Sequence, residues 1–325
     1  MRIKIFGVHG GRKVSALGAA CVMALLWAAW GPVDRSSAAN SIANVDQLVA
    51  QHLDSIGSAK VRADMKSRVV QGPVQFKILV GGAGTLEGKA ILVSEGKKIQ
   101  FMIKLPNNDY RGEQFVFDGN KDKVAYSTAT QSRSAFGNLV FVQDAILREG
   151  LIGGVLSTAW PLLDLNERKP KLTYEGVKTV DGRQVHDVVY HPHKNSDLDI
   201  HLYFDEETCR HVETVYRYSI QPGLTGNGPG PGFSMPGPGG LDNPTGTAGG
   251  VSPDMAAARQ TPTRYRLQEK FSEFKTVDGI TLPTHYDIQF TAEQQNGRTT
   301  VSDWDLKALE ANSNVSLDPR NFEVK

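Results

Sequence analysis

The chain has 325 residues, of which 36 are Lys or Arg and 35 are Asp or Glu, so its formal net charge is +1. This balance argues against nucleic acid or an anionic membrane surface as the main partner, because both attract strongly basic proteins. The length allows one large all-β unit or two modest domains.

Residues 1–39 have the three-part pattern of a secretory signal peptide. A basic start is followed by an apolar run over residues 14–30 and by the small residues Ser-Ala-Ala at 37–39. We therefore predict export, with cleavage after Ala39 and a single mature domain over residues 40–325. The apolar run is short for a membrane span, which needs about 20 residues. Any contact of the mature protein with a membrane is expected to be transient at most.

The predicted cleavage changes both the charge and the cysteine count. It removes five basic residues and one acidic residue, which leaves 31 basic and 34 acidic residues and a net charge near −3. Cys21 leaves with the signal, so Cys209 has no partner for an intramolecular disulfide and stability must come from a packed core. Cys21 also lies inside the apolar run rather than at its end, which argues against a lipid anchor.

The first predicted elements of the mature chain are one helix and a series of strands. Apolar residues at helical spacing predict a helix over residues 44–57, capped by Asn44 and ended by Gly57. Alternating apolar and polar residues then predict strands over residues 73–80, 98–105, 115–117 and 124–126. In the first of these, Phe76, Ile78 and Val80 should share one face. Such alternation is typical of an antiparallel sheet with one covered face.

Residues 138–165 have little alternation and much apolar surface. We predict two short helices there, broken at Gly150 and at residues 153–154 and ended by the Trp-Pro pair at 160–161. A segment this apolar should form a cover over the sheet. The side chains expected to face the sheet are Phe141, Ile146, Leu151, Val155 and Leu156.

Strands are predicted again over residues 170–190, 197–205, 211–220, 263–275, 280–292 and 298–310. The sequence Lys-Thr-Val-Asp-Gly occurs at 178–182 and again at 275–279. Each copy predicts a hairpin, because Asp-Gly suits a two-residue turn in which both residues have positive φ. The repeat is compatible with a duplicated unit or with two independent hairpins.

Residues 222–262 interrupt the strands. Eleven glycines and seven prolines occupy residues 222–254, with few bulky apolar residues. A segment of this composition cannot form a core, so we predict a disordered insertion between two paired strands. A recognition role for the insertion is an alternative.

The sequence contains no motif that identifies an enzyme. No GxSxG elbow, Walker loop, HExxH pair or CxxC pair occurs. The densest polar group has residue types that zinc prefers, namely His186, His191, His193, Asp197, Asp199, His201 and Asp205. Over residues 197–205, however, the polar residues alternate with apolar ones, which predicts a solvated strand face. We predict no catalytic residue, no metal site and no cofactor.

Two alternatives stay open at this point. Acidic residues that could pair for glycoside hydrolysis are Asp199, Glu206, Glu207 and Glu213, although nothing isolates one pair. The aromatic residues of the strands could line a cavity for an acyl chain or another apolar ligand, or they could fill a dry core.

The order of these parts resembles the LolA/LolB-like superfamily, and more specifically its outer-membrane lipoprotein-sorting-like periplasmic proteins. The resemblance rests on the opening helix at 45–57, the strand meander, the cover, the segments 174–190 and 202–214, and Asp-Pro-Arg-Asn-Phe at 318–322. It implies an antiparallel half-barrel capped by helices, in the periplasm. Carriers of the superfamily hold acyl chains in an apolar cavity without cofactor or catalysis, and other members are sensors that bind a signalling protein.

These observations favour a soluble periplasmic carrier that binds a lipid or lipoprotein acyl chain, with the cover as a lid. The expected lining is Phe76, Ile99, Phe101, Ile103, Phe115 and Phe117. One alternative is an envelope sensor or interaction protein that docks a protein partner on the same fold. The other is an undetected hydrolase.

Overall fold

The computed structural model describes residues 44–126, 132–194, 196–221 and 262–323. The predicted signal peptide and nearly all of the predicted insertion lie outside these described residues. Within them, every helix is too short or too polar to span a membrane.

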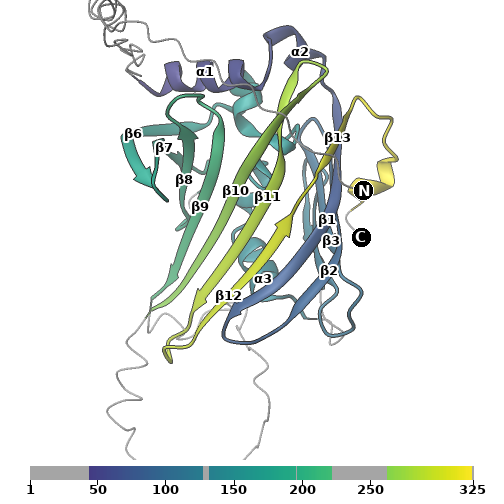
Figure 1. Ribbon diagram of the computed structural model, residues 1–325, viewed down its shortest axis with the longest axis vertical. Helices are drawn as coiled ribbons and strands as arrows, with labels where there is room; N and C mark the ends of the chain where they lie inside the picture. The colour runs from purple at the N-terminus through teal and green to yellow at the C-terminus, as the bar shows by residue number, and fades with distance from the viewer. Residues whose placement is uncertain (1–43, 127–131, 195, 222–261, 324–325) are drawn as a thin grey trace, which may run out of the picture. The chain divides into compact units, whose positions relative to one another are not determined.

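The strands form one open antiparallel sheet (Figure 1). Their order is β5-β4-β3-β2-β1-β12-β11-β10-β9-β8-β7-β6, and β13 also pairs with β1. The sheet is open because β5 and β6 are its two ends. The predicted antiparallel sheet with one covered face is confirmed. The strands are β1 (Ser67–Val80), β2 (Thr85–Glu95), β3 (Lys98–Lys104), β4 (Gly112–Phe117), β5 (Asp122–Val124), β6 (Lys171–Val180), β7 (Arg183–His191), β8 (Asp199–Asp205), β9 (His211–Ile220), β10 (Thr263–Val277), β11 (Ile280–Glu293), β12 (Thr299–Leu306) and β13 (Glu310–Ser313).

Alternation decides which side chains lie on the covered face, which we call the inner face. In β3, Ile99, Phe101 and Ile103 are buried while the residues between them are partly exposed. The predicted alternation over 98–105 is therefore confirmed. Each buried side chain of this size contributes on the order of 2 kcal/mol relative to its exposed state.

Two hairpins have the turns that their sequences predict. Asp181 and Gly182 have φ values of 49° and 77°, and Asp278 and Gly279 have 51° and 78°. The flanking residues of each turn are paired, which leaves two-residue turns of the kind that suits Asp-Gly. At the other end of β9 and β10, Ile220 pairs with Thr263, so residues 221–262 connect the ends of two neighbouring strands.

The opening helix also forms as predicted. In α1 (Val45–Ile56), the side chain of Asn44 accepts a hydrogen bond from the backbone N–H of Gln47 at 2.9 Å, and the helix ends at Gly57. α1 is followed by α2 (Ala59–Asp64). Helix α1 lies across one end of β8–β11 in Figure 1 and buries Leu48, Val49, His52 and Ile56.

The cover, residues 135–168, is more fragmented than the two predicted helices. It consists of α3 (Ala135–Val142), α4 (Ala145–Arg148), η1 (Gly154–Leu156), η2 (Pro161–Asp164) and α5 (Leu165–Arg168). Gly150 and Gly153 have φ values of 70° and 75°, which glycine adopts without steric cost, so the chain turns at both. A further short helix, η3 (Pro319–Phe322), lies near the end of the chain. Figure 1 shows α3 behind β10–β12, on the inner side of the sheet.

Three expectations about single side chains are wrong. Phe141 does not face the sheet: its side chain is 41% exposed, because α3 turns Phe136, Leu139 and Val140 inward. Val80 is 47% exposed, because a bulge between Ile78 and Val80 interrupts the alternation. Tyr126, which belongs to the strand predicted over residues 124–126, is exposed and lies beyond the end of β5.

Candidate functional site

The inner face and the cover pack into one apolar core. The six side chains expected to line a cavity are all buried, and so are the cover residues Ile146, Leu151, Val155 and Leu156. All ten belong to the same cluster of buried residues. The structure thus brings both predicted sets together, with Phe141 of the cover outside.

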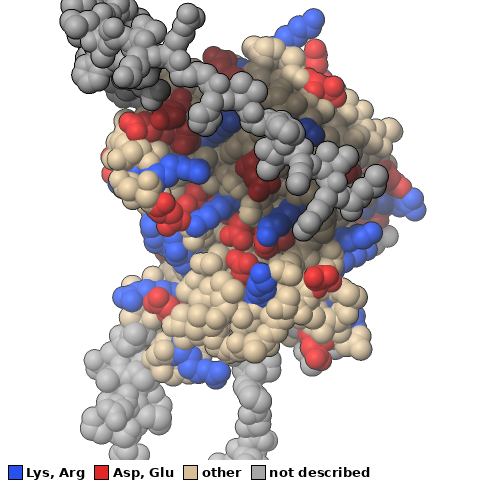
Figure 2. All heavy atoms as spheres, viewed as in Figure 1, with Lys and Arg blue, Asp and Glu red and all other residues tan. Residues whose placement is uncertain are grey.

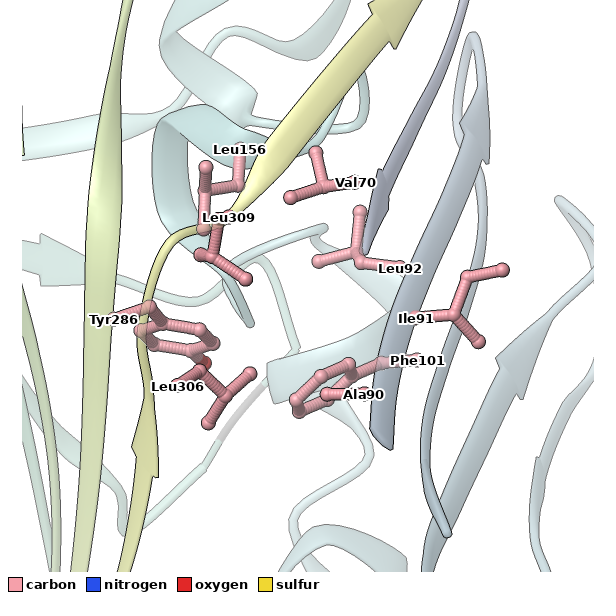
Figure 3. Close-up of a pocket in the computed structure, with 9 residues that line it drawn as sticks. All are labelled: Val70, Ala90, Ile91, Leu92, Phe101, Leu156, Tyr286, Leu306 and Leu309. Carbon is pink, nitrogen blue, oxygen red and sulfur yellow. The ribbon is translucent and has the colours of Figure 1, made fainter. Parts of the chain in front are cut away.

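A cavity remains between the inner face and η1 (Figure 3). Its volume is about 10 Å³. A single water molecule needs about 10–15 Å³ by this kind of measure, so the cavity is far too small for an acyl chain. Of the six expected lining residues, only Phe101 borders it. The residues around it are Val70, Ala90, Ile91, Leu92, Phe101, Leu156, Tyr286, Leu306 and Leu309.

A buried carboxylate lies on this apolar face and contacts the cover. Glu269 of β10 is fully buried, and its carboxylate accepts hydrogen bonds from the hydroxyl groups of Tyr216 (2.7 Å) and Tyr286 and from the backbone N–H of Gly153 (2.8 Å). Burial raises the pKa of Glu269, although these hydrogen bonds oppose the rise. No salt bridge of the described residues includes it. The carboxylate therefore depends on three neutral donors, one of which belongs to the cover.

An arginine contacts the same turn of the cover. Arg68 of β1 is fully buried, and its Nη1 donates to the backbone carbonyl of Val155 at 2.6 Å. Burial lowers the pKa of Arg68 to about 10. Glu269 and Arg68 thus bind an N–H and a carbonyl group within residues 153–155. The cover is fixed to the sheet by two charged side chains at this turn.

The C-terminal half of the cover is held by an aromatic cluster beneath α1. The Nε1–H of Trp160 donates to Nε2 of His52 at 3.2 Å, and the ring of Trp160 stacks on His211 at 4.6 Å between centroids. His52 Nδ1 donates to the carbonyl of Cys209 at 3.1 Å, which fixes its tautomer. Burial lowers the pKa of His52 to about 4 and that of His211 well below its usual range. Both rings are neutral at physiological pH.

A second buried carboxylate holds the start of the cover. Glu113 of β4 accepts hydrogen bonds from the hydroxyl groups of Tyr110 (2.7 Å) and Ser134, and Ser134 in turn caps α3 by accepting the N–H of Gly137 at 2.8 Å. Burial raises the pKa of Glu113 to about 7, against the effect of these two hydrogen bonds. Its Oε2 atom is buried without a hydrogen-bond partner.

Sequence reasoning missed both carboxylates, although a signal was present. Glu269 is two residues from both Leu267 and Phe271 in its strand, and Glu113 is two residues from Phe115 in its own. Each glutamate therefore shares a strand face with buried apolar residues. An acidic residue in register with buried apolar neighbours is costly unless it is hydrogen-bonded. Such a residue therefore indicates a polar contact within the covered face.

The polar stretch of β7 and β8 lies mainly on the outer face of the sheet, and its histidines are separated. His201 donates from Nδ1 to the buried Asp187 at 2.7 Å, whereas His186 faces inward and bonds Tyr174 at 2.9 Å. His193 contacts Glu149 of the cover. Among the described residues, no group of three or more His, Cys, Asp or Glu side chains is placed to hold a metal ion.

The expectation of a solvated face over 197–205 is wrong for Tyr203. Its side chain is buried against Val185, Val212 and Val215 on the outer face. Elsewhere on the face viewed in Figure 2, acidic and basic side chains are interspersed, which is typical of a solvated surface.

The outer face also carries a row with the residue types of a hydrolase triad. His285 is 3.1 Å from the hydroxyl of Ser272 and donates to Asp305 at 2.7 Å. The three residues lie on the neighbouring strands β10, β11 and β12, and Lys307 also binds Asp305. A triad additionally needs donors placed for an oxyanion. We interpret the row as cross-strand pairing on a sheet surface.

The cysteine among the described residues is not activated. Cys209 is buried, its Sγ donates to Oε1 of Gln51 at 3.1 Å, and burial raises the pKa of the thiol. A thiol in this setting is a poor nucleophile.

No protein-family model and no curated protein matches the chain. Several solved structures match it. A DUF1329 family protein from Desulfovibrio piger is 13% identical, with 86% of this chain and 97% of that chain covered and a TM-score of 0.43. A domain named for outer membrane lipoprotein sorting from Vibrio parahaemolyticus is 8% identical, with 84% and 95% covered and a TM-score of 0.39.

A LolA superfamily protein from Nitrosomonas europaea is 9% identical, with 86% of this chain and 98% of that chain covered and a TM-score of 0.38. TM-scores below 0.5 describe a loose likeness, which says nothing about a ligand. The structural neighbours of this chain thus include DUF1329 family and LolA superfamily proteins.

Proposed function

We propose that the protein is a soluble periplasmic carrier that binds the acyl chain of a lipid or lipoprotein on the inner face of the sheet. One observation carries this proposal. Apart from the end beneath α1, the apolar inner face is covered by one chain segment, residues 135–168, which pairs with no strand of the sheet. A segment of this kind can leave the sheet without breaking a strand ladder.

The size of the cavity determines how such a ligand would bind. Because the cavity at η1 holds no more than about one water molecule, an acyl chain that binds between the inner face and η1 would take the place of part of the cover. The apolar contacts of Leu151, Val155 and Leu156 would then be replaced by contacts of the chain. The lid is the cover. The lining is the set predicted from the sequence, namely Phe76, Ile99, Phe101, Ile103, Phe115 and Phe117.

The filled interior favours a second candidate, an envelope sensor or interaction protein. A protein of this kind needs no internal space for a ligand, and its partner would bind the outside of the same fold. The two candidates differ in whether the cover must move.

Weakening the cover separates the two candidates. Leu151→Ala removes buried contacts between the cover and the sheet, at a cost of about 2–5 kcal/mol. If the ligand binds only after the cover leaves, the variant should bind dansylundecanoate at least about thirtyfold more tightly than the unaltered protein, because a loss of about 2 kcal/mol in the closed state raises the population of the open state by that factor. Phe141→Ala is the matched control, since Phe141 lies on the solvent side of the cover. Unchanged or weaker binding by Leu151→Ala would contradict the carrier.

Protein purified from its own envelope supplies the second test. Native mass spectrometry that finds a bound lipid supports the carrier, and a stoichiometric protein partner supports the interaction protein. The intact mass of the same sample reports whether the chain is cleaved after Ala39.

A further inference from the structure

We propose that Glu269 selects ligands that carry an N–H donor beside the acyl chain, namely secondary acyl amides rather than esters or fatty-acid anions. This inference rests on the proposed function, and it names the chemical class of the ligand.

Two of the three donors stay with the sheet. Tyr216 belongs to β9 and Tyr286 to β11, the two strands that flank Glu269 on β10. The third donor, the N–H of Gly153, belongs to the cover. When the cover leaves, Glu269 keeps its tyrosines and loses one hydrogen bond.

The loss is costly because the surroundings are apolar. Glu269 lies between Leu267 and Phe271 on the inner face, and no salt bridge of the described chain neutralises it. A charged acceptor that loses a donor in such a place is destabilised by more than a neutral one. A ligand that supplies an N–H in place of Gly153 restores the hydrogen bond.

The carbonyl group of an amide also finds a partner. Arg68 donates to the carbonyl of Val155 while the cover is in place, and it is released by the same movement. An amide thus offers an acceptor for Arg68 and a donor for Glu269. An ester offers only the acceptor, and a fatty-acid anion would place a second negative charge near Glu269.

The test compares two probes that differ in one group. N-methyldodecanamide and methyl dodecanoate have the same chain, and only the first has an N–H. Each displaces dansylundecanoate from the unaltered protein, and we expect the amide to bind about tenfold more tightly, which is the effect of one hydrogen bond to a charged group.

Two variants assign the preference to Glu269. In Glu269→Met the two probes should bind equally, and in Glu269→Gln, which keeps the size and one acceptor oxygen, the preference should fall to about twofold or threefold. A purely structural role for Glu269 would change the binding of both probes by the same factor. Glu113→Gln, at the other buried carboxylate, is the control and should retain the preference.

The outcomes are distinct. Equal binding of amide and ester by the unaltered protein overturns the selection by Glu269 and leaves acyl binding intact. An amide preference in Glu269→Met, or an undiminished preference of about tenfold in Glu269→Gln, also overturns it. Binding of neither probe overturns the proposed function itself, and the inference with it.

Discussion

Replacing Glu113 by Gln should stabilise the protein at neutral and alkaline pH and have much less effect in acid. Burial raises the pKa of this carboxyl from 4.5 to about 7. Below pH 4.5 the group is protonated in both the folded and the unfolded chain. Between pH 4.5 and about 7, the Glu113 carboxyl ionises in the unfolded chain but stays protonated in the folded chain. The stability that the protonated group contributes is therefore lost as the pH rises through this range.

The magnitude follows from the change in pKa. One pKa unit corresponds to about 1.36 kcal/mol, so the rise from 4.5 to about 7 corresponds to about 3 kcal/mol. Gln keeps an oxygen that can accept hydrogen bonds from Tyr110 and Ser134 and cannot ionise. The free energy of unfolding of the variant, relative to the unaltered protein, should therefore rise by about 3 kcal/mol between pH 4 and pH 8.

Urea unfolding at one-unit steps across this range measures the difference at each pH. The matched control is Glu87→Gln, which removes a carboxylate from an exposed position of β2. A difference for Glu113→Gln that does not change with pH, or one that grows toward acid, would refute the reasoning.

Two further predictions concern the cover. Burial lowers the pKa of His52 from 6.5 to about 4, so the stability that the neutral ring contributes is complete above pH 6.5 and is lost, by about 3 kcal/mol, as the pH falls toward 4. His52→Gln should flatten this acid loss in urea titrations, and an unchanged slope would contradict it. Gly150→Ala should lower the melting temperature far more than Gly96→Ala. Both glycines have positive φ, which costs an alanine roughly 1–2 kcal/mol, but only at Gly150 would the new Cβ meet a backbone oxygen, that of Ala159, at 2.0 Å. Equal melting temperatures would show that the clash is relieved.

Local signals account for the elements that the sequence predicts well. The Asp-Gly turns at 181–182 and 278–279 require positive φ, and few other residue pairs adopt it, so two hairpins could be placed in advance. The strict alternation around Phe101 identified its buried face. Val80 departs from its alternation because a bulge depends on the partner strand, which the local sequence does not contain.

The candidate site was less predictable, for a different reason. Whether Phe101 and Phe115 line a cavity or fill a core depends on how closely the cover packs against the sheet. The pattern of apolar residues in the sequence is the same in both cases and therefore does not distinguish them. Glu269 finds its donors in Tyr216, 53 residues earlier, and in Gly153, 116 residues earlier. Only the folded sheet brings these three residues together.

The pairing of β1 has a consequence for the order in which the chain can fold. One edge of β1 pairs with β2, which follows it directly, but the other edge pairs with β12 and β13, more than two hundred residues later. A chain that emerges N-terminus first therefore holds β1 with one unsatisfied edge until nearly all of it has appeared. Exposed edges of this kind pair readily with other chains. The long sequence separation between β1 and its partners β12 and β13 also slows their pairing. The last strands are thus the ones that complete the sheet, and a chain truncated before residue 299 should aggregate rather than fold.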